Sequence, residues 1–258
     1  MCNWKAGLVC TAALLGGGFS AYEKAPEVLA HYGIVDTVQY YQDHVDACVM
    51  IQMKDRNLDG LRTVGSGFFI TEDGYLLTNW HVVNAIKERS ATRGIPLYYV
   101  GTAKGETYEA QLVFSDKESD VALLKIEVKD KQNTLLLEST PYYLRGERVF
   151  TIGHYLQNQY VFSVGYTAGW RDMSYMGDGK VHHVLLIDLA MHHGSSGGPL
   201  MNIHGRVIGM TSCGGFDKDG GVLYIQGART LDEQLKALQE GFNNLGLTSQ
   251  TLKKALRL

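Results

Sequence analysis

Short apolar runs, separated by residues that favour turns, recur along most of this 258-residue chain and constrain its fold more than any other feature. Glycine-containing turns, such as those at residues 72–74 and 104–105, mark hairpins between the runs. Two groups of about six strands at this spacing predict an all-β protein, built either as paired β barrels or as a sandwich. The predicted strands cover residues 48–53, 64–70, 75–80, 97–100, 108–115, 121–128, 148–153, 160–170, 180–189, 205–212 and 222–226.

The composition excludes two classes of protein. Hydrophobic residues make up 45% of the chain and charged residues 20%, with 4 prolines, which is typical of a folded domain and not of a disordered chain. The formal net charge is −3, so the chain lacks the basic surface that binding to a nucleic-acid backbone requires. We therefore expect no nucleic-acid partner.

Residues 1–22 have the pattern of a secretory signal peptide. Lys5 precedes a run without charged residues over 6–22, and small residues end that run. This pattern predicts a periplasmic or secreted protein. The run is at the short edge for a membrane span, so an uncleaved anchor that tethers the protein to the membrane stays open, as does a plain buried segment.

Three segments differ in character from the strands. Residues 23–47 are predicted as a helical lead-in, 131–145 as a connector and 229–258 as a helical tail, which leaves 48–130 and 146–228 for the two groups of strands. In the tail, Thr230 and Glu233 fit a capping box, and leucines at 231, 235 and 238 follow a helical period. A second short helix is predicted at 252–256.

The cysteines do not form a disulfide-rich framework. Cys2 and Cys10 lie within the predicted signal, and Cys48 and Cys213 are far apart in the chain. We expect the latter two as small buried thiols, although a bridge between them stays open.

The segment GSSGGPL, from Gly194 to Leu200, points to nucleophilic catalysis. When a carbonyl is attacked, negative charge develops on its oxygen, and preorganised backbone N–H groups stabilise that charge. A glycine two residues before Ser196 lets the amides of Gly194 and Ser196 converge on one point, with Ser195 as a further candidate donor. Ser196 is therefore the predicted nucleophile, and these three residues form the predicted oxyanion hole.

A serine nucleophile needs a base and a group that orients the base. His81, in the segment TNWHVV, follows an apolar strand and is the predicted base. Asp120, in SDVALLKIE, stands before another strongly apolar strand and is the predicted orienting carboxylate. The order His, Asp, Ser is one of the recognised arrangements of this triad.

Together these segments resemble the HtrA (Deg) family of trypsin/chymotrypsin-fold serine peptidases. GSGFFITEDGYLLTNWHVV is similar to that family's histidine segment, YVGTAKGETYEAQLVFSDKESDVALLKIE to its aspartate segment, and IDLAMHHGSSGGPLMNIHGRVIGMTS to its nucleophile segment. The resemblance covers about residues 46–240. It implies two six-stranded antiparallel β barrels of the chymotrypsin type, flanked by the N-terminal helical lead-in and a C-terminal helix. It also implies a serine endopeptidase that hydrolyses unfolded or exposed protein segments through an acyl-enzyme, without a cofactor.

The sequence departs from the family pattern in two places. The family carries PDZ domains after the protease, whereas this sequence ends before one, so regulation through such a domain is not expected. The family also has Asn-Pro before the oxyanion glycine, where this chain has His192 and His193. This second departure leaves open whether the oxyanion turn is formed in the resting protein.

The resemblance also indicates a specificity pocket. Trypsin-like relatives that select basic side chains have a carboxylate at the position of Ala190, so no such preference is expected here. Met191 is predicted to line the wall, and Ser212, Cys213 and Gly214 to pair with the substrate backbone. These residues predict a preference for small or medium apolar side chains before the scissile bond.

The sequence also bears on metal binding, on a rival function and on the oligomeric state. Adjacent histidines on a strand point to opposite faces, and no cysteine or carboxylate spacing completes a site, so we expect no metal. A binding module on a protease scaffold is the rival function, although a binder has no need of all three triad residues. Related proteases form homo-oligomers, and the sequence alone leaves the oligomeric state open.

Overall fold

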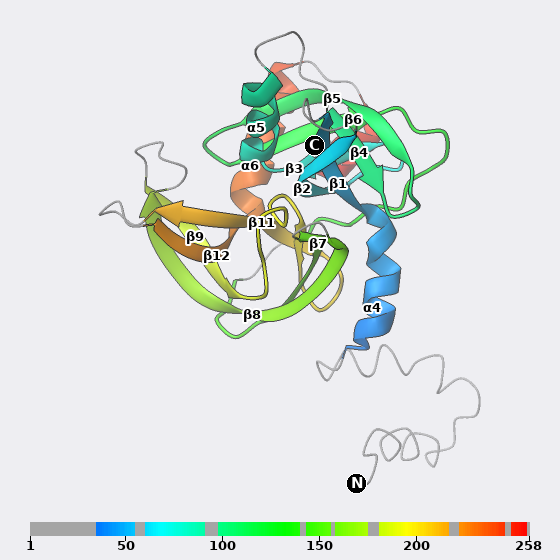
Figure 1. Cartoon of the computed structure of the whole chain (residues 1–258). Helices are drawn as coiled ribbons and strands as arrows, with labels where there is room; N and C mark the ends of the chain where they lie inside the picture. The colour runs from blue at the N-terminus through cyan, green and yellow to red at the C-terminus, as the bar shows by residue number, and fades with distance from the viewer. Residues whose placement is uncertain are drawn as a thin grey trace, which may run out of the picture. The chain divides into compact units, whose positions relative to one another are not determined.

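The computed structural model describes residues 35–54, 60–90, 98–139, 143–155, 158–174, 181–216, 222–245 and 249–256 (Figure 1). The chain divides into two units, Met1–Tyr40 and Tyr41–Leu258. Helix α4 (Thr37–His44) begins in the first unit, where Asp36 Oδ1 accepts two backbone N–H groups of its first turn at 3.0 and 3.3 Å. A short 3-10 helix η1 (Val45–Ala47) follows. The predicted signal peptide, and residues 23–34 of the predicted lead-in, lie outside the described residues.

The first barrel is closed by six antiparallel strands in the order β1-β2-β3-β6-β5-β4. Alternate side chains point inward, and Ile51, Phe69, Val100 and Leu124 are among the buried residues that fill the interior. The strands are β1 (Cys48–Lys54), β2 (Leu61–Phe69), β3 (Tyr75–Thr78), β4 (Tyr98–Thr102), β5 (Thr107–Asp116) and β6 (Val121–Ile126).

The second barrel is closed in the order β10-β11-β12-β9-β8-β7. Its core includes Val149, Leu185, Ile187, Leu200 and Ile208. The strands are β7 (Arg148–Tyr155), β8 (Asn158–Ser174), β9 (Val181–Asp188), β10 (Pro199–Met201), β11 (Val207–Phe216) and β12 (Val222–Thr230). Two closed six-stranded barrels confirm the predicted all-β fold class in its barrel form, and the sandwich alternative is wrong (Figure 1).

The strand predicted at 75–80 ends two residues early. β3 stops at Thr78, and Trp80 begins helix α5 (Trp80–Ser90), which was not predicted. Val82, Val83 and Ile86 lie on one face of α5 and are buried in the core of the first barrel. These apolar residues continue the strand's hydrophobic run, so the pattern alone did not mark the change from strand to helix. The short strand β10 was also missed, because three residues are too few to show an alternation.

The helical tail was predicted correctly in its apolar face and wrongly in its cap. Helix α6 (Leu231–Asn244) buries Leu231, Leu235 and Leu238, as their spacing predicted. The side chain of Thr230 makes no capping hydrogen bond. A tyrosine from a distant segment bonds to this end of the helix, since the N–H of Leu231 donates to the hydroxyl of Tyr143 at 3.1 Å.

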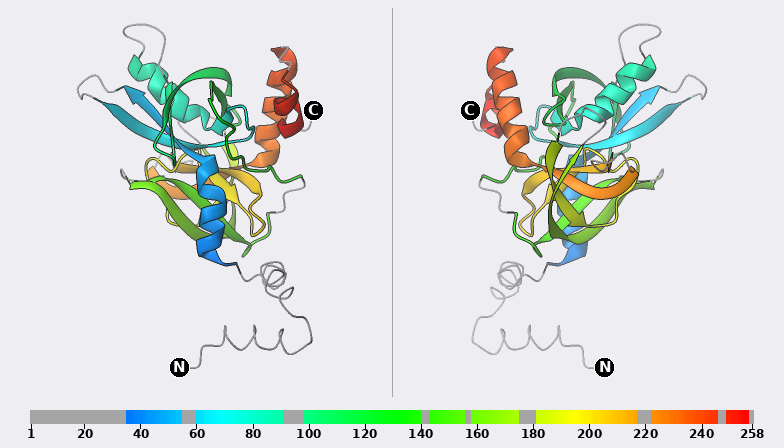
Figure 2. Two further views of the ribbon diagram at one scale, coloured as in Figure 1. Left: turned by 90° about the vertical axis from the view of Figure 1, so that its right-hand side faces the viewer. Right: turned by 90° about the vertical axis from the view of Figure 1, so that its left-hand side faces the viewer.

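Helix α6 leaves the second barrel and packs against the first. A Cβ added to Gly241 would lie 2.2 Å from the ring of Phe114 on β5, so this glycine permits a close approach. Helix α7 (Gln250–Leu256) lies beside α6, and Gln239 Nε2 donates to the carbonyl of Leu256 at 2.8 Å (Figure 2). Within the described residues no helix is both long enough and apolar enough to cross a membrane.

Candidate active site

The strand pairing of the first barrel brings His81 and Asp120 together. Thr78 on β3 is paired with Ala122 on β6, three residues before the histidine and two after the aspartate. His81 lies in the first turn of α5, and its Nδ1 is 2.9 Å from Asp120 Oδ2 and 3.0 Å from Oδ1. A carboxylate only accepts hydrogen bonds, so Nδ1 carries the proton and Nε2 is left as the basic nitrogen.

The carboxylate of Asp120 is held by groups from both barrels. Its side chain is 1% exposed, and Oδ1 also accepts the backbone N–H of His81 at 3.0 Å. Ser212 on β11 of the second barrel donates to Oδ2 at 3.5 Å. The backbone of Asp120 has a φ of 50°, and its carbonyl accepts a hydrogen bond from Asn79 Nδ2 at 2.9 Å. Aspartate tolerates this left-handed conformation better than most residues do.

The backbone around Ser196 packs against the same part of the first barrel. The carbonyl of Ser196 accepts the N–H of Ser66 on β2 at 2.8 Å. At the next residue, Gly197, a Cβ would lie 2.3 Å from the carbonyl oxygen of Ser66 and 2.4 Å from Thr78 Oγ1. Ser196 itself is 6% exposed. The segments that carry the three predicted triad residues therefore meet where the two barrels adjoin.

A tight turn from His192 to Ser195 precedes the candidate nucleophile. The N–H of Ser195 donates to the carbonyl of His192 at 2.9 Å, and Gly194 has a φ of 104°, which glycine adopts without strain. The N–H of His192 in turn donates to Ser195 Oγ at 3.2 Å. The amide of Ser195 is thus engaged inside the turn, and its place in the oxyanion hole stays a prediction. Gly194 and Ser196 remain the candidate donors.

The predicted pocket residues differ in their exposure. Ala190 is exposed, and its carbonyl accepts a hydrogen bond from Ser163 Oγ at 2.9 Å. The side chain of Met191 is 0% exposed and packs in the core of the second barrel. Its place in the pocket wall stays a prediction. Gly214 belongs to β11, and the side chain of Cys213 lies outside the described part of the chain.

Several polar residues at the site were missed by sequence reasoning. Ser66 Oγ donates to the carbonyl of Gly194 at 2.7 Å, and Thr211 Oγ1 donates to that of Ser195 at 2.7 Å. The ring of His154 lies against Gly194, and burial lowers its pKa. Its Nδ1 is buried without a hydrogen-bond partner among the described residues. The one available signal was a serine between two glycines at 65–67, since small residues there let another segment approach.

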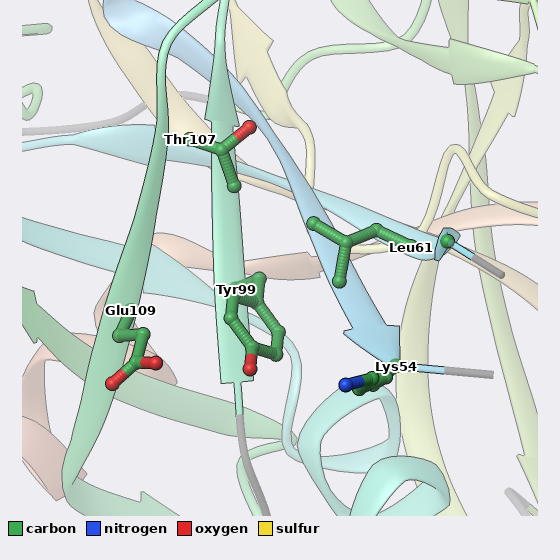
Figure 3. Close-up of a pocket in the computed structure, with 6 residues that line it drawn as sticks. Lys54, Leu61, Tyr99, Thr107 and Glu109 are labelled. Atoms are coloured by element: carbon green, nitrogen blue, oxygen red, sulfur yellow. The ribbon is translucent and has the colours of Figure 1, made fainter. Parts of the chain in front are cut away.

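Two other features are separate from this site. Cys48 is a buried free thiol, and burial raises its pKa, which makes it a poor nucleophile. A pocket on the first barrel contains none of the candidate residues (Figure 3). Its lining residues are Lys54, Gly60, Leu61, Tyr99, Thr107 and Glu109.

Among the residues that the structure describes, no three His, Cys, Asp or Glu side chains lie close enough together to bind a metal ion.

Comparison with known proteins agrees with this geometry. A family model described as a trypsin-like peptidase domain matches residues 65–210. The chain is 34% identical to Serine protease HTRA1 of Xenopus laevis over 152 residues, which are 57% of this chain and 31% of the relative. It is 37% identical to Serine protease HTRA3 of Homo sapiens over 152 residues, 57% of this chain and 32% of the relative.

A bacterial relative matches over a longer range. The chain is 34% identical over 205 residues to a probable periplasmic serine endoprotease DegP-like of Pseudomonas fulva, which covers 76% of this chain and 40% of the relative. The matched part thus spans less than half the length of each of these relatives. Because the family model covers more than half of the sequence, the chain belongs to the trypsin-like peptidase family, as a serine peptidase domain similar to those of the HtrA and DegP-like proteases.

Proposed function

We propose that this chain is an endopeptidase that cleaves peptide bonds in unfolded or exposed protein segments through an acyl-enzyme. Ser196 is the nucleophile, His81 the general base and Asp120 the group that orients the base. The observation that carries this proposal is the hydrogen bond between His81 Nδ1 and the buried carboxylate of Asp120. That bond leaves Nε2 as the nitrogen that can remove a proton from a hydroxyl.

The reaction proceeds in two halves with the same residues. Ser196 Oγ attacks the scissile carbonyl while its proton passes to His81 Nε2, and a tetrahedral adduct forms. His81 then gives this proton to the leaving amine, the C–N bond breaks, and an ester to Ser196 remains. Water, deprotonated by the same nitrogen, attacks the ester and releases the new carboxyl terminus. Asp120 stabilises the imidazolium during both halves.

The negative oxygen of each tetrahedral adduct is assigned to the amides of Gly194 and Ser196. These amides flank the peptide between Gly194 and Ser195, whose N–H and carbonyl are both engaged by the turn and by Ser66. Preorganised donors of this kind are worth about 10²–10³ in kcat each. The departure from the family at His192 and His193 is compatible with such a turn, since the backbone of His192 supplies both of its closing bonds to Ser195.

We further propose a preference for small or medium apolar side chains before the scissile bond. Ala190 supplies no charge at the base of the pocket, and Ser212 and Gly214 on β11 would face the substrate backbone. The family resemblance and the signal-like residues 1–22 favour a periplasmic or secreted protein. The Pseudomonas fulva relative, a probable periplasmic endoprotease, favours the same location. Membrane fractionation and light scattering of the full chain test the tether and the homo-oligomer, both of which stay open.

The direct test is digestion of an unfolded protein by the wild type and by Ser196→Ala, with the products mapped by mass spectrometry. Loss of the serine should lower kcat by several orders of magnitude. An organofluorophosphate should label the wild type at Ser196. If the wild type neither cleaves the protein nor takes up the label, the chain is a binding module on a protease scaffold. Cleavage mainly after Arg or Lys would overturn the proposed specificity.

A further inference from the structure

We propose that Ser66 is a positioning residue for this reaction. Ser66 belongs to the first barrel and holds in place the turn from His192 to Ser195 of the second barrel, here called the oxyanion turn. The inference rests on the proposed function. Ser66 lies on β2 and is 0% exposed. Its backbone N–H donates to the carbonyl of Ser196 at 2.8 Å, and its carbonyl accepts Thr78 Oγ1 at 2.7 Å. The residue therefore bonds both to the nucleophile and to the end of the strand that leads to His81.

The hydroxyl of Ser66 has a fixed direction. It accepts the backbone N–H of His154 at 2.8 Å and lies 2.7 Å from the carbonyl oxygen of Gly194. A hydroxyl has one proton, and the N–H of His154 can only donate, so the proton of Ser66 goes to Gly194. The side chain consequently joins β7 and the oxyanion turn through a single oriented dipole.

The carbonyl that Ser66 binds lies between the two proposed oxyanion donors. It belongs to the peptide between Gly194 and Ser195, and the N–H of this peptide donates to His192 at 2.9 Å. The peptide plane is thus held at both ends. Rotation of this plane would turn the amides of Gly194 and Ser196 away from their common point. Because Gly194 has little conformational resistance of its own, these two bonds have to supply the restraint.

Without the hydroxyl, the partly buried carbonyl of Gly194 would lose the hydrogen bond that Ser66 donates. A carbonyl that loses its donor in a partly buried position is destabilised, which favours rotation of the peptide towards another donor. Such a rotation would weaken binding of the tetrahedral adduct more than binding of the substrate, since the adduct alone carries the negative oxygen. We therefore expect Ser66 to act on kcat more than on KM.

The experiment compares Ser66→Ala with Thr102→Val in the full chain. Thr102 is a matched control, because it lies on β4 of the same barrel, is 2% exposed, and accepts a backbone N–H in a hairpin at 3.2 Å. Ser66→Ala should lower kcat about 10–100-fold with KM changed less than about threefold, since loss of a whole oxyanion donor costs about 10²–10³. Thr102→Val should lower the melting temperature and leave kcat at the wild-type value.

A second measurement uses a peptide aldehyde, whose adduct with Ser196 places an oxygen in the oxyanion hole. Ser66→Ala should weaken this inhibitor by the same factor as kcat, and should leave unchanged the affinity for the matching peptide amide, which forms no adduct. Ser66→Cys keeps a side chain of similar size with a weak donor, so its kcat should lie between those of the wild type and Ser66→Ala. If Ser66→Ala does not fold, the same pair of affinities measured on Ser66→Cys decides the question.

The outcomes separate this inference from the function on which it rests. Wild-type kcat and aldehyde affinity in Ser66→Ala, with Ser196→Ala inactive, would overturn the role of Ser66 and leave the protease intact. Equal losses of kcat in Ser66→Ala and Thr102→Val would also overturn it, since the effect would then follow stability alone. Full activity of Ser196→Ala would instead overturn the proposed function itself.

Discussion

Gly197→Ala should lower both the stability and the activity of this protein, because Gly197, the residue after the proposed nucleophile, is in close contact with the first barrel. Its φ of 88° costs a residue with a Cβ about 1–2 kcal/mol. The added Cβ would also lie 2.3 Å from the carbonyl oxygen of Ser66 and 2.4 Å from Thr78 Oγ1. Relief of such overpacking typically costs a further ~1–3 kcal/mol. The expected loss in the free energy of unfolding is therefore about 2–5 kcal/mol.

Gly105→Ala separates the two contributions. Gly105 has a φ of 81° and nothing within 4 Å of an added Cβ, so it carries the backbone term without the steric one. It should lose only about 1–2 kcal/mol. Urea unfolding followed by tryptophan fluorescence measures both variants. In thermal unfolding the difference should appear as about 2–4 °C for each kcal/mol.

The activity of the two variants should differ more sharply than their stability. Relief of the clash has to move the backbone next to Ser196, and a displacement of about 1 Å at a reacting group costs about 10²-fold in rate. Gly105→Ala should keep the kcat of the wild type. The inferred contact between Gly197 and the first barrel would be refuted if Gly197→Ala were as stable as Gly105→Ala and kept a kcat within twofold of the wild type.

Three further predictions follow from single contacts. Asp120→Asn should fold but lose about 10⁴-fold in kcat, because an amide selects the wrong tautomer of His81; steady-state hydrolysis at wild-type rate would contradict this. Burial lowers the pKa of His154. Below about pH 6.5 the unfolded chain therefore binds more protons at this residue than the folded protein does, and the folded state loses stability as the pH falls through the lowered pKa. Urea unfolding of His154→Gln should show a smaller loss of stability on acidification than urea unfolding of the wild type. Tyr143→Phe should lose about 1–2 kcal/mol of stability without a change in kcat, because its hydroxyl bonds a carbonyl of β11 and the first N–H of α6; Tyr108→Phe, whose hydroxyl donates to an exposed glutamate, is the control and should stay within about 0.5 kcal/mol.

Most of the strands and helices could be predicted because short stretches of sequence indicate them. Alternating apolar residues and glycine turns are properties of neighbouring residues, and they located eleven of the strands and the apolar face of α6. The errors occurred where one pattern fits two structures. The run through Trp80 and Val83 serves a strand and a helix equally well, and the helix forms because one face of α5 is buried by the first barrel. The predicted cap of α6 was wrong because the side chain of Thr230 makes no capping hydrogen bond, and Tyr143, from a distant segment, accepts the N–H of Leu231.

The sequence by itself determined the kind of chemistry, through residue types and their order. Ser196 between glycines, with His81 and Asp120 each beside an apolar strand, follows from reading the chain, and the roles of these residues stay predictions. Only the tertiary structure decided how they are held. Ser66 and Gly194 are 128 positions apart. The glycines beside Ser66 indicate that another segment approaches it, but nothing in the sequence identifies Gly194 as part of that segment. Such a contact exists only because the two closed barrels pack against each other, so the bonds between them are a property of the folded molecule and not of any segment of it.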